Sequence, residues 1–258
     1  MSVRPVAYRQ VNSMASTSTG REPDIDWSDL IPEQEWEVQK PIIERAQALD
    51  LPFALGGGLA FSEYARRLRN TKDLDLFINP RDGDAFLRIL DELGWEDYHS
   101  TKEYERHWIY RGTKRGLIID IIWRMPNERA DIDDEWLTRG KLVRIHGTEL
   151  RLLPVEELIW SKLYVVQRDR SDWSDLLNLV HTQGEHLDWD YLLDRVQEDR
   201  LLLGGLLNIY RWMCQGDAMK LPPHIWERMG LMQMPLAGEC RLDRVRLLDT
   251  RDWFGPNT

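Results

Sequence analysis

The chain has 258 residues, of which 42% are hydrophobic, and a formal net charge of −10 at pH 7. Such an acidic chain is not expected to present a broad nucleic-acid surface, although its charge suits a cationic small substrate and leaves room for local contact with an RNA end. No apolar stretch approaches the roughly 18 residues of a membrane span, and the first residues lack the apolar region of a signal peptide. Cys214 and Cys240 lie far apart without metal-ligand neighbours. We therefore expect a cytoplasmic protein with no membrane association, disulfide framework or zinc site.

The order of predicted elements indicates a mixed fold. Residues 1–25, rich in Ser and Thr, are expected to form a flexible N-terminal segment. Helices are expected at 41–49 and 82–93, strands at 96–100, 107–110 and 117–123, and a turn at 112–116. Two short strands at 141–145 and 149–152 precede helical patterns at 154–167, 171–181, 189–197 and 201–214. The predicted class is α/β (α+β), with a mixed-sheet core over residues 26–152 and a helical domain over residues 153–258.

Three consecutive glycines interrupt the chain after a short apolar segment. Residues 53–55 are typical of a buried strand, and residues 59–68 have helical character. Gly56, Gly57 and Gly58 would therefore lie at a helix N-terminus, where unpaired N–H groups and the helix dipole favour phosphate. A tight turn without a ligand is the alternative.

Two aspartates alternate with apolar residues a little further along the chain. In a strand, successive side chains point to opposite faces, so Asp73 and Asp75 would project together while Leu74 and Leu76 cover the other side. Adjacent carboxylates repel one another, and a divalent cation between them removes that repulsion. Mg²⁺ prefers one or two carboxylates together with phosphate oxygens and water, which indicates a metal-bound nucleotide. The alternative is a solvated strand edge.

A third aspartate lies at the centre of the apolar run from Leu117 to Trp123. Runs of this kind suit strands that are covered on both faces. An isolated carboxylate there is costly unless a metal or a donor accompanies it. Asp120 is therefore either a buried structural aspartate, bonded to backbone amides or to an arginine, or a member of the metal site.

The stretch from the glycines to the aspartates resembles the nucleotidyltransferase superfamily, which has a DNA polymerase beta-like fold. It is most similar to the AbiEii-like nucleotidyltransferase toxins and to the small antibiotic nucleotidyltransferases. Gly58 stands where the superfamily often has Ser, Thr or Trp, so this position brings no hydroxyl to the triphosphate. The resemblance implies that Asp120 is the third acidic residue and that a set of residues binds nucleotide: Gly56, Gly57, Gly58, Arg69 and Thr71.

A lysine and a later aspartate extend the same resemblance. Lys162 falls on the apolar stripe of the helix expected at 154–167, a position from which a lysine can extend its head to solvent. In the AbiEii-like proteins a lysine of this helix contacts nucleotide phosphate, and Lys162 matches its place. Asp172, in the segment RDRSDWSDL that follows, would complete the nucleotide site, although Asp172 and Asp175 also suit the first turn of a helix electrostatically.

These residues together predict a magnesium-dependent nucleotidyltransferase. An acceptor hydroxyl would attack the α-phosphate of a nucleoside triphosphate and expel pyrophosphate, with two Mg²⁺ ions held by Asp73, Asp75 and Asp120. Lys162 and the segment after it favour an RNA acceptor, as in a toxin-like enzyme with an antitoxin-like protein partner. The alternative acceptor is a cationic small molecule, as in an antibiotic nucleotidyltransferase. A catalytically weak nucleotide-binding or partner-binding protein of the same fold is the alternative from another class.

Overall fold

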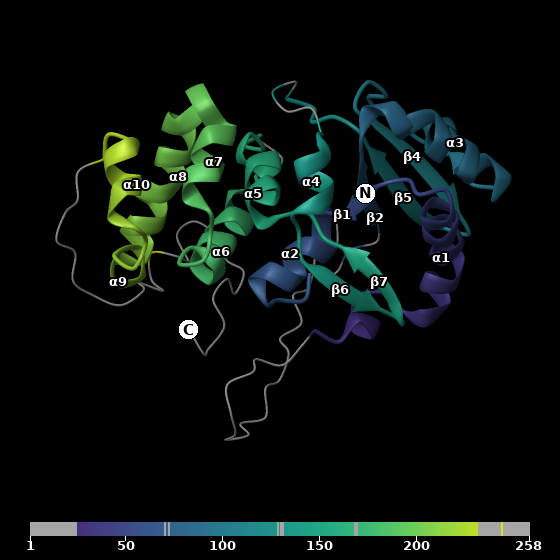
Figure 1. Ribbon diagram of the computed structural model, residues 1–258, viewed down its shortest axis with the longest axis horizontal. Coiled ribbons are helices and arrows are strands. Elements are labelled where there is room, and N and C mark those ends of the chain that lie inside the picture. Colours follow the sequence, from purple (N-terminus) through teal and green to yellow (C-terminus); the bar gives the residue numbers. More distant parts are fainter. Residues whose placement is uncertain are drawn as a thin grey trace, which may run out of the picture. The chain divides into compact units, whose positions relative to one another are not determined.

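The computed structural model describes residues 25–69, 71, 73–127, 129, 132–167, 170–231 and 244. The chain divides into two compact units, residues 1–154 and 155–258. The first unit contains both sheets, and the second is built from helices (Figure 1). Each unit is described by itself below.

A five-stranded mixed sheet forms the centre of the first unit. Its strands lie in the order β1-β2-β5-β4-β3. The parallel pair β2 and β5 is flanked by antiparallel pairs on both sides. A separate two-stranded sheet is formed by β6 and β7. The strand bounds are β1 Phe53–Leu55, β2 Asp73–Ile78, β3 Glu96–Asp97, β4 Ile109–Lys114, β5 Leu117–Ile122, β6 Leu142–Ile145 and β7 Thr148–Arg151.

Helices connect and cover these strands. The α-helices of this unit are α1 Glu33–Ala48, α2 Gly57–Ala65, α3 Gly83–Glu92 and α4 Asp134–Thr138. Short 3₁₀ helices lie at η1 Trp27–Asp29, η2 Pro80–Asp82 and η3 Tyr98–Ser100. The strand expected at 96–100 therefore ends at Asp97, because the Asp97 side chain caps η3 by accepting a hydrogen bond from the His99 N–H.

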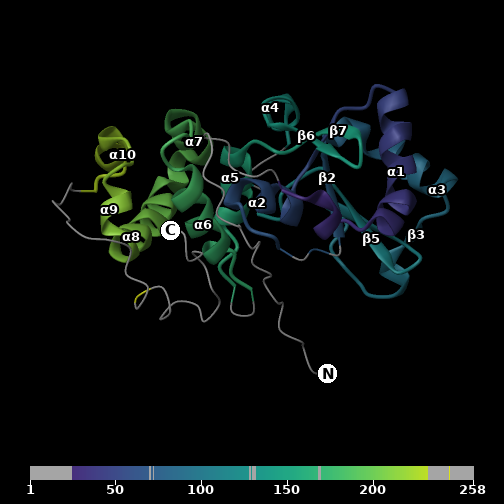
Figure 2. The same cartoon turned by 90° about the horizontal axis from the view of Figure 1, so that it is seen from below.

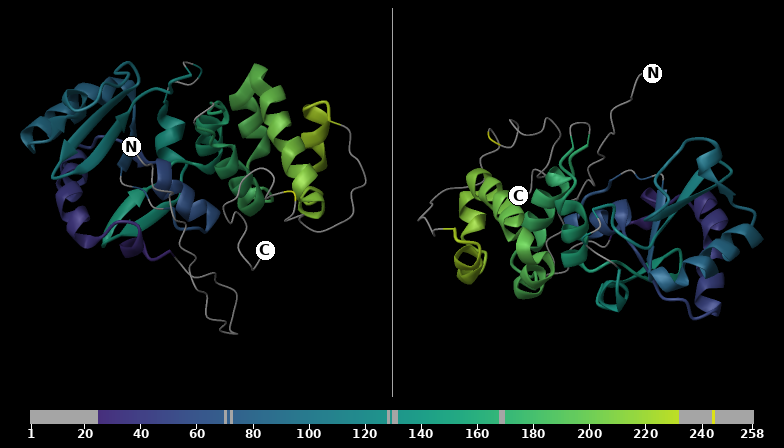
Figure 3. Two further views of the ribbon diagram at one scale, coloured as in Figure 1. Left: turned by 180° about the vertical axis from the view of Figure 1, so that it is seen from behind. Right: turned by 90° about the horizontal axis from the view of Figure 1, so that it is seen from above.

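One face of the inner strand β2 is buried. Leu74, Leu76 and Ile78 are at most 1% exposed, and burial of one such side chain contributes about 1.5–3 kcal/mol. Phe53, the register partner of Ile78, meets Phe86 of α3 edge to face. Helix α1 packs beside α3 (Figures 1 and 3). The aspartates lie on the opposite face of β2, where Phe77 is buried against Trp136 of α4.

The hairpin of β4 and β5 differs from the sequence prediction. We expected residues 112–116 to turn, whereas only Arg115 and Gly116 do, with φ values of 52° and 79°. Two positive φ values are typical of the type I′ turn, whose twist matches that of paired strands. The first strand of the hairpin therefore extends further than predicted, and Arg111 becomes the register partner of Asp120.

The second unit is a cluster of helices around an apolar interior. Its α-helices are α5 Val155–Leu163, α6 Trp173–Gln183, α7 Trp189–Val196, α8 Arg200–Met213, α9 Gln215–Ala218 and α10 Pro223–Arg228, with the 3₁₀ helix η4 at Gln197–Asp199. Helices α6 and α7 both pack against α8 (Figure 2). The core residues are completely buried and include Ile159, Leu176, Leu192, Leu203 and Leu206.

The predicted fold class is confirmed: a mixed α/β unit is followed by a helical unit. Residues 1–24 of the flexible segment expected at 1–25, and most of the last forty residues, lie outside the described part of the chain. Within that part, every helix is too short or too polar to cross a membrane.

Candidate active site

The register of the sheet places three of the predicted side chains in one row. Asp75 of β2 is paired with Asp120 of β5, and Asp120 is paired with Arg111 of β4. Register partners on neighbouring strands project to the same face. Asp73 precedes Asp75 by two positions and therefore shares that face. We call the three aspartates Asp73, Asp75 and Asp120 the carboxylate row.

Asp120 is the buried end of the carboxylate row, and an arginine holds it. Its side chain is 4% exposed, against 34% for Asp73. Arg111 Nε donates to Asp120 Oδ1 at 2.7 Å, and Arg111 Nη2 donates to Asp120 Oδ2 at 2.5 Å. The same Nη2 lies 3.8 Å from Asp73 Oδ2. The arginine-bonded state, one of the two alternatives for Asp120, is therefore present in this structure.

The contact with Asp120 raises the pKa of Arg111. The hydrogen bonds to Asp120 raise the pKa of the Arg111 guanidinium above its ordinary value, against the lowering effect of burial, and the charges of Asp120, Asp73 and Asp75 add to the increase. A bidentate pair of this kind is among the stronger charge-assisted contacts in proteins. Arg111 was missed in the sequence because the predicted turn at 112–116 gave it no strand partner.

The glycines join the start of α2 to the carboxylate row. Gly56 is the residue before the helix, and its N–H donates to the backbone oxygen of Asp75 at 3.0 Å. Gly57 has a φ of +52°, and a Cβ added to it would lie 1.7 Å from Asp75 Oδ2. The Asp75 carboxylate thus rests against the first residue of the helix, and only glycine leaves room for it.

The helix start supplies donors beside that carboxylate. The first N–H groups of an α-helix have no acceptor within the helix. At α2 the N–H of Gly56 donates to the backbone oxygen of Asp75, so the N–H groups that can meet a ligand start with that of Gly57. A Cβ at Gly58 would lie 2.7 Å from Thr71 Cβ, so Thr71 fills the space that a side chain at Gly58 would need. Thr71 Oγ1 donates to the backbone oxygen of Asp73 at 3.1 Å.

Arg69 lies in the connection between α2 and β2. Its backbone N–H donates to Ser62 Oγ at 3.0 Å, and Ser62 Oγ in turn donates to the backbone oxygen of Gly58 at 2.8 Å. The Arg69 guanidinium lies 5.7 Å from the ring centroid of Phe61. The connection is therefore folded back onto α2 and keeps a cationic side chain near the helix.

This arrangement fits a divalent cation. The row offers carboxylate oxygens, the ligands that Mg²⁺ prefers, and the helix start beside Asp75 offers a place for the phosphates that accompany it. The close approach of the Asp75 carboxylate to Gly57 brings the two parts within one site. The residues that would hold the cation are Asp73 and Asp75, with Asp120 as the third ligand.

The other two predicted site residues belong to the helical unit and contact one another there. Lys162 Nζ lies 2.8 Å from Asp172 Oδ2 and 3.1 Å from Asp175 Oδ2. All three side chains are at most 9% exposed, so Lys162 does not extend to solvent. Arg170 donates from Nε and Nη2 to Asp172. We call Lys162, Asp172 and Asp175 the buried cluster.

The pKa of Asp172 is lowered by its two basic partners, Lys162 and Arg170. Burial raises its pKa, but the charges and hydrogen bonds of Lys162 and Arg170 prevail and lower it to about 2 from an ordinary 3.8. Asp175 occupies the first turn of α6, as its sequence position suggested, and also pairs with Lys162. A lysine shared by two buried carboxylates was not visible in the sequence, because nothing in the spacing of the apolar stripe shows which way α6 returns.

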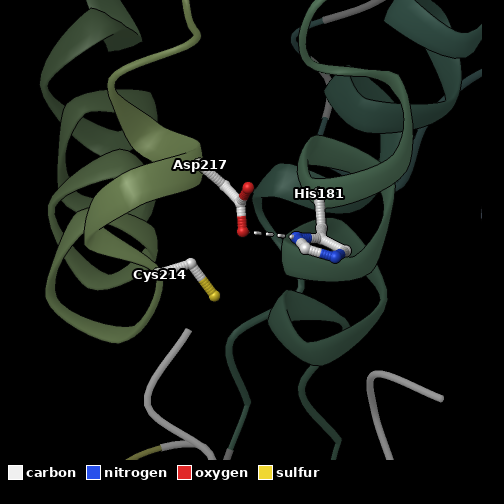
Figure 4. A group of neighbouring side chains, drawn as sticks. All are labelled: His181, Cys214 and Asp217. Carbon is white, nitrogen blue, oxygen red and sulfur yellow. Dashed lines mark ion pairs between the residues drawn. The ribbon is translucent and has the colours of Figure 1, made fainter. Parts of the chain in front are cut away.

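A further group of titratable side chains also lies in the helical unit. His181, Cys214 and Asp217 present atoms within 4.8 Å of one another (Figure 4), and His181 Nδ1 lies 3.8 Å from Asp217 Oδ2. Cys214 is disulfide-bonded, which the sequence did not suggest, and its sulfur is not available as a thiolate ligand. This group therefore gives no support to a metal site.

Comparison with known proteins gives one family. Residues 33–212, about 70% of the chain, match the family described as uncharacterised nucleotidyltransferase. The match spans the glycines, the carboxylate row and Lys162. No curated protein matches the sequence.

Several solved structures are distantly similar, among them the following three. The antibiotic-resistance factor ANT(2'')-Ia is 18% identical, with 69% of this chain and 98% of that chain covered and a TM-score of 0.45. The lincosamide antibiotic adenylyltransferase LnuA is 12% identical, with 58% and 97% covered and a TM-score of 0.40. An antigenic nucleotidyltransferase-like protein from Paracoccidioides brasiliensis is 17% identical, with 69% and 94% covered and a TM-score of 0.39. These similarities are too distant to assign a substrate.

Proposed function

Since the chain belongs to the family of uncharacterised nucleotidyltransferases, we propose that it moves a nucleoside monophosphate from a nucleoside triphosphate to an acceptor hydroxyl. The observation that carries this proposal is the carboxylate row beside a glycine-started helix, with Asp75 against Gly57. The new bond joins the acceptor oxygen to the α-phosphorus, the bond to the β-phosphate breaks, and pyrophosphate leaves.

Each part of the site has a defined task in this reaction. Asp73 and Asp75 hold the cation, and Mg²⁺ when bound would stabilise the attacking and leaving oxygens, as two such ions do in related chemistry. The first N–H groups of α2 face the β- and γ-phosphates. Asp120 accepts the hydroxyl proton or serves as the third ligand. Positioning and electrostatic stabilisation supply most of the rate enhancement in such reactions.

The remaining predicted residues take secondary tasks. Arg69 and Thr71 lie in the connection before β2, where they contribute charge and order to the phosphate side of the site. A phosphate contact by Lys162, with Asp172 completing the site, would have to use the third N–H of a buried ammonium whose other two donors are held by carboxylates. Their existing ion pairs support a structural task at least as well.

The chemistry of the protein favours a cationic small molecule as acceptor. The formal net charge of −10 attracts cations and repels an RNA backbone. An RNA acceptor with an antitoxin-like partner is the second candidate. It rests on the resemblance around Lys162 and is weakened by the buried position of that lysine.

A transfer screen tests the proposal. Purified protein is incubated with Mg²⁺ and each labelled nucleoside triphosphate, together with aminoglycosides, total RNA or protein, and label transfer and pyrophosphate release are measured. We expect transfer to one acceptor class and none from the variant with Asp73→Asn and Asp75→Asn. Equal transfer by wild type and this variant would place the reaction outside the carboxylate row.

A further inference from the structure

We infer that Arg111 is a displaceable counter-ion of the carboxylate row, which holds Asp120 until a divalent cation replaces it and thereby sets the cation affinity of the site. The inference rests on the proposed function, because it assumes that Asp73 and Asp75 bind a cation. It adds a positioning residue that does not itself bind metal.

The backbone and the surroundings of Arg111 prepare it for this contact. The register of β4 with β5 places it directly opposite Asp120. Its backbone N–H donates to Tyr104 Oη at 3.0 Å, and its guanidinium lies 6.0 Å from the ring centroid of Tyr98. The side chain therefore meets Asp120 in a defined orientation, as its two hydrogen bonds show.

The guanidinium also approaches a second carboxylate of the row. Arg111 Nη2 donates to Asp120 Oδ2 and lies 3.8 Å from Asp73 Oδ2, so a single positive group approaches two carboxylates of the row. Mg²⁺ needs carboxylate oxygens at about 2.0–2.1 Å. Arg111 uses one lone pair on each oxygen of Asp120, so a cation that binds Asp120 through a remaining lone pair lies close to the guanidinium charge.

Arg111 is the partner that can move away. Asp120 lies on the middle strand of the sheet, and its short side chain is 4% exposed. The Arg111 side chain is 31% exposed and has several rotatable bonds. A dication on the row repels a guanidinium at such short distance. The aromatic face of Tyr98 and the adjacent solvent can receive the displaced group.

The alternative is a permanent ion pair with no relation to a cation. In both cases, loss of Arg111 leaves Asp120 as a buried charge without its partner, which destabilises the metal-free protein. A displaceable counter-ion predicts that the same loss tightens cation binding through Asp120, because the cation then faces no competitor there. A permanent pair predicts at most a gain from the removed charge near Asp73, so the two accounts differ in whether the gain depends on Asp120.

The test uses Mn²⁺ alone, without nucleotide, as a spectroscopic probe for the full-length protein. Its affinity is measured by electron paramagnetic resonance and calorimetry for wild type, Arg111→Gln and Arg111→Lys. We expect Arg111→Gln to bind Mn²⁺ at least about tenfold more tightly, with Arg111→Lys between it and wild type. Adding Asp120→Asn to Arg111→Gln should remove the gain. Arg106→Gln, which breaks an ion pair with Asp97 on the same sheet, should leave the affinity unchanged.

The possible outcomes separate this inference from the proposed function. Equal or weaker Mn²⁺ binding by Arg111→Gln, or a gain that survives Asp120→Asn, overturns the role of Arg111 while leaving cation binding by Asp73 and Asp75 intact. Wild-type binding that does not depend on Asp73 and Asp75 contradicts the proposed function itself. If Arg111→Gln folds only with Mn²⁺ present, that dependence supports the inference, and if it does not fold at all, the affinity of Arg111→Lys decides.

Discussion

The carboxylate row with its neighbour Arg111 and the buried cluster both combine aspartates with a basic side chain, but they differ in access. Asp73 of the row and the neighbouring Arg111 are about one-third exposed, whereas Asp120 is buried. In the buried cluster, Lys162, Asp172 and Asp175 are all nearly inaccessible. A ligand can reach the carboxylate row without local unfolding, whereas it can reach the buried cluster only if the helices around the cluster move apart. A match to a sequence pattern is therefore insufficient to identify a binding residue.

The two regions also differ in how the charges are held. The row lies along the register of β2 and β5, with Arg111 of β4 as the next partner and a glycine-started helix against Asp75. The buried cluster joins α5 to α6, with one lysine shared by two carboxylates. The first arrangement leaves donors and acceptors directed at a common face, and the second directs them at one another. We therefore expect mutations to affect ligand binding in the row and folding in the cluster.

The largest expected effect is on stability, from Lys162→Met. Removal of the lysine leaves Asp172 and Asp175 as buried carboxylates without their shared partner, which costs about 3–5 kcal/mol. Chemical denaturation measures the change. Adding Asp172→Asn and Asp175→Asn should recover much of the loss, since no unpaired charge remains. A Lys162→Met protein of normal stability that has lost nucleotide binding would assign Lys162 to the ligand instead.

A smaller but more specific effect is expected from Gly57→Ala. The left-handed backbone at Gly57 costs an alanine about 1–2 kcal/mol, and the new methyl group would displace the Asp75 carboxylate. We predict loss of metal-dependent nucleotide binding, measured by calorimetry. Gly147→Ala is the matched control, because Gly147 has a φ of +81° and a Cβ added to it would meet no other atom within 4 Å. It should lose stability alone, and equal binding losses in both variants would contradict the close contact.

Acid should weaken the buried cluster by about 2 kcal/mol. The pKa of Asp172 is lowered to about 2 from 3.8, so its ion pairs contribute stability above pH 4 that is lost as pH falls toward 2. Each unit by which the pKa of Asp172 differs between the folded and unfolded protein corresponds to about 1.4 kcal/mol of stability. Denaturation midpoints between pH 5 and 2 measure the loss. Asp172→Asn should flatten this dependence, and an unchanged profile would show that other carboxylates dominate.

Sequence reasoning succeeded where the pattern was local. Alternation within one strand placed Asp73 and Asp75 on one face, and the glycine segment located the start of a helix, at Gly57 rather than at 59. The class of the fold followed from the order of strand and helix patterns. The row could be anticipated because these features depend only on neighbours along the chain.

Contacts between distant segments were not accessible in the same way. Arg111 was missed because a turn of two residues was predicted as a turn of five, which removed its register with Asp120. Correct recognition of Arg115-Gly116 as a type I′ turn would have restored that partner. The partners of Lys162 depend on how α6 packs on α5, which no spacing within either helix reveals.

The central claim is that the carboxylate row binds a metal-bound nucleotide. The direct test is thermal unfolding with and without Mg²⁺ and a nucleoside triphosphate, because a ligand that binds only the folded state raises the melting temperature. The control variant, Asp190→Asn with Asp194→Asn, removes two exposed carboxylates that pair with Arg228. We predict a Mg²⁺-dependent increase for wild type and this control, and none for the folded variant with Asp73→Asn and Asp75→Asn. Equal increases in all three proteins would contradict the account.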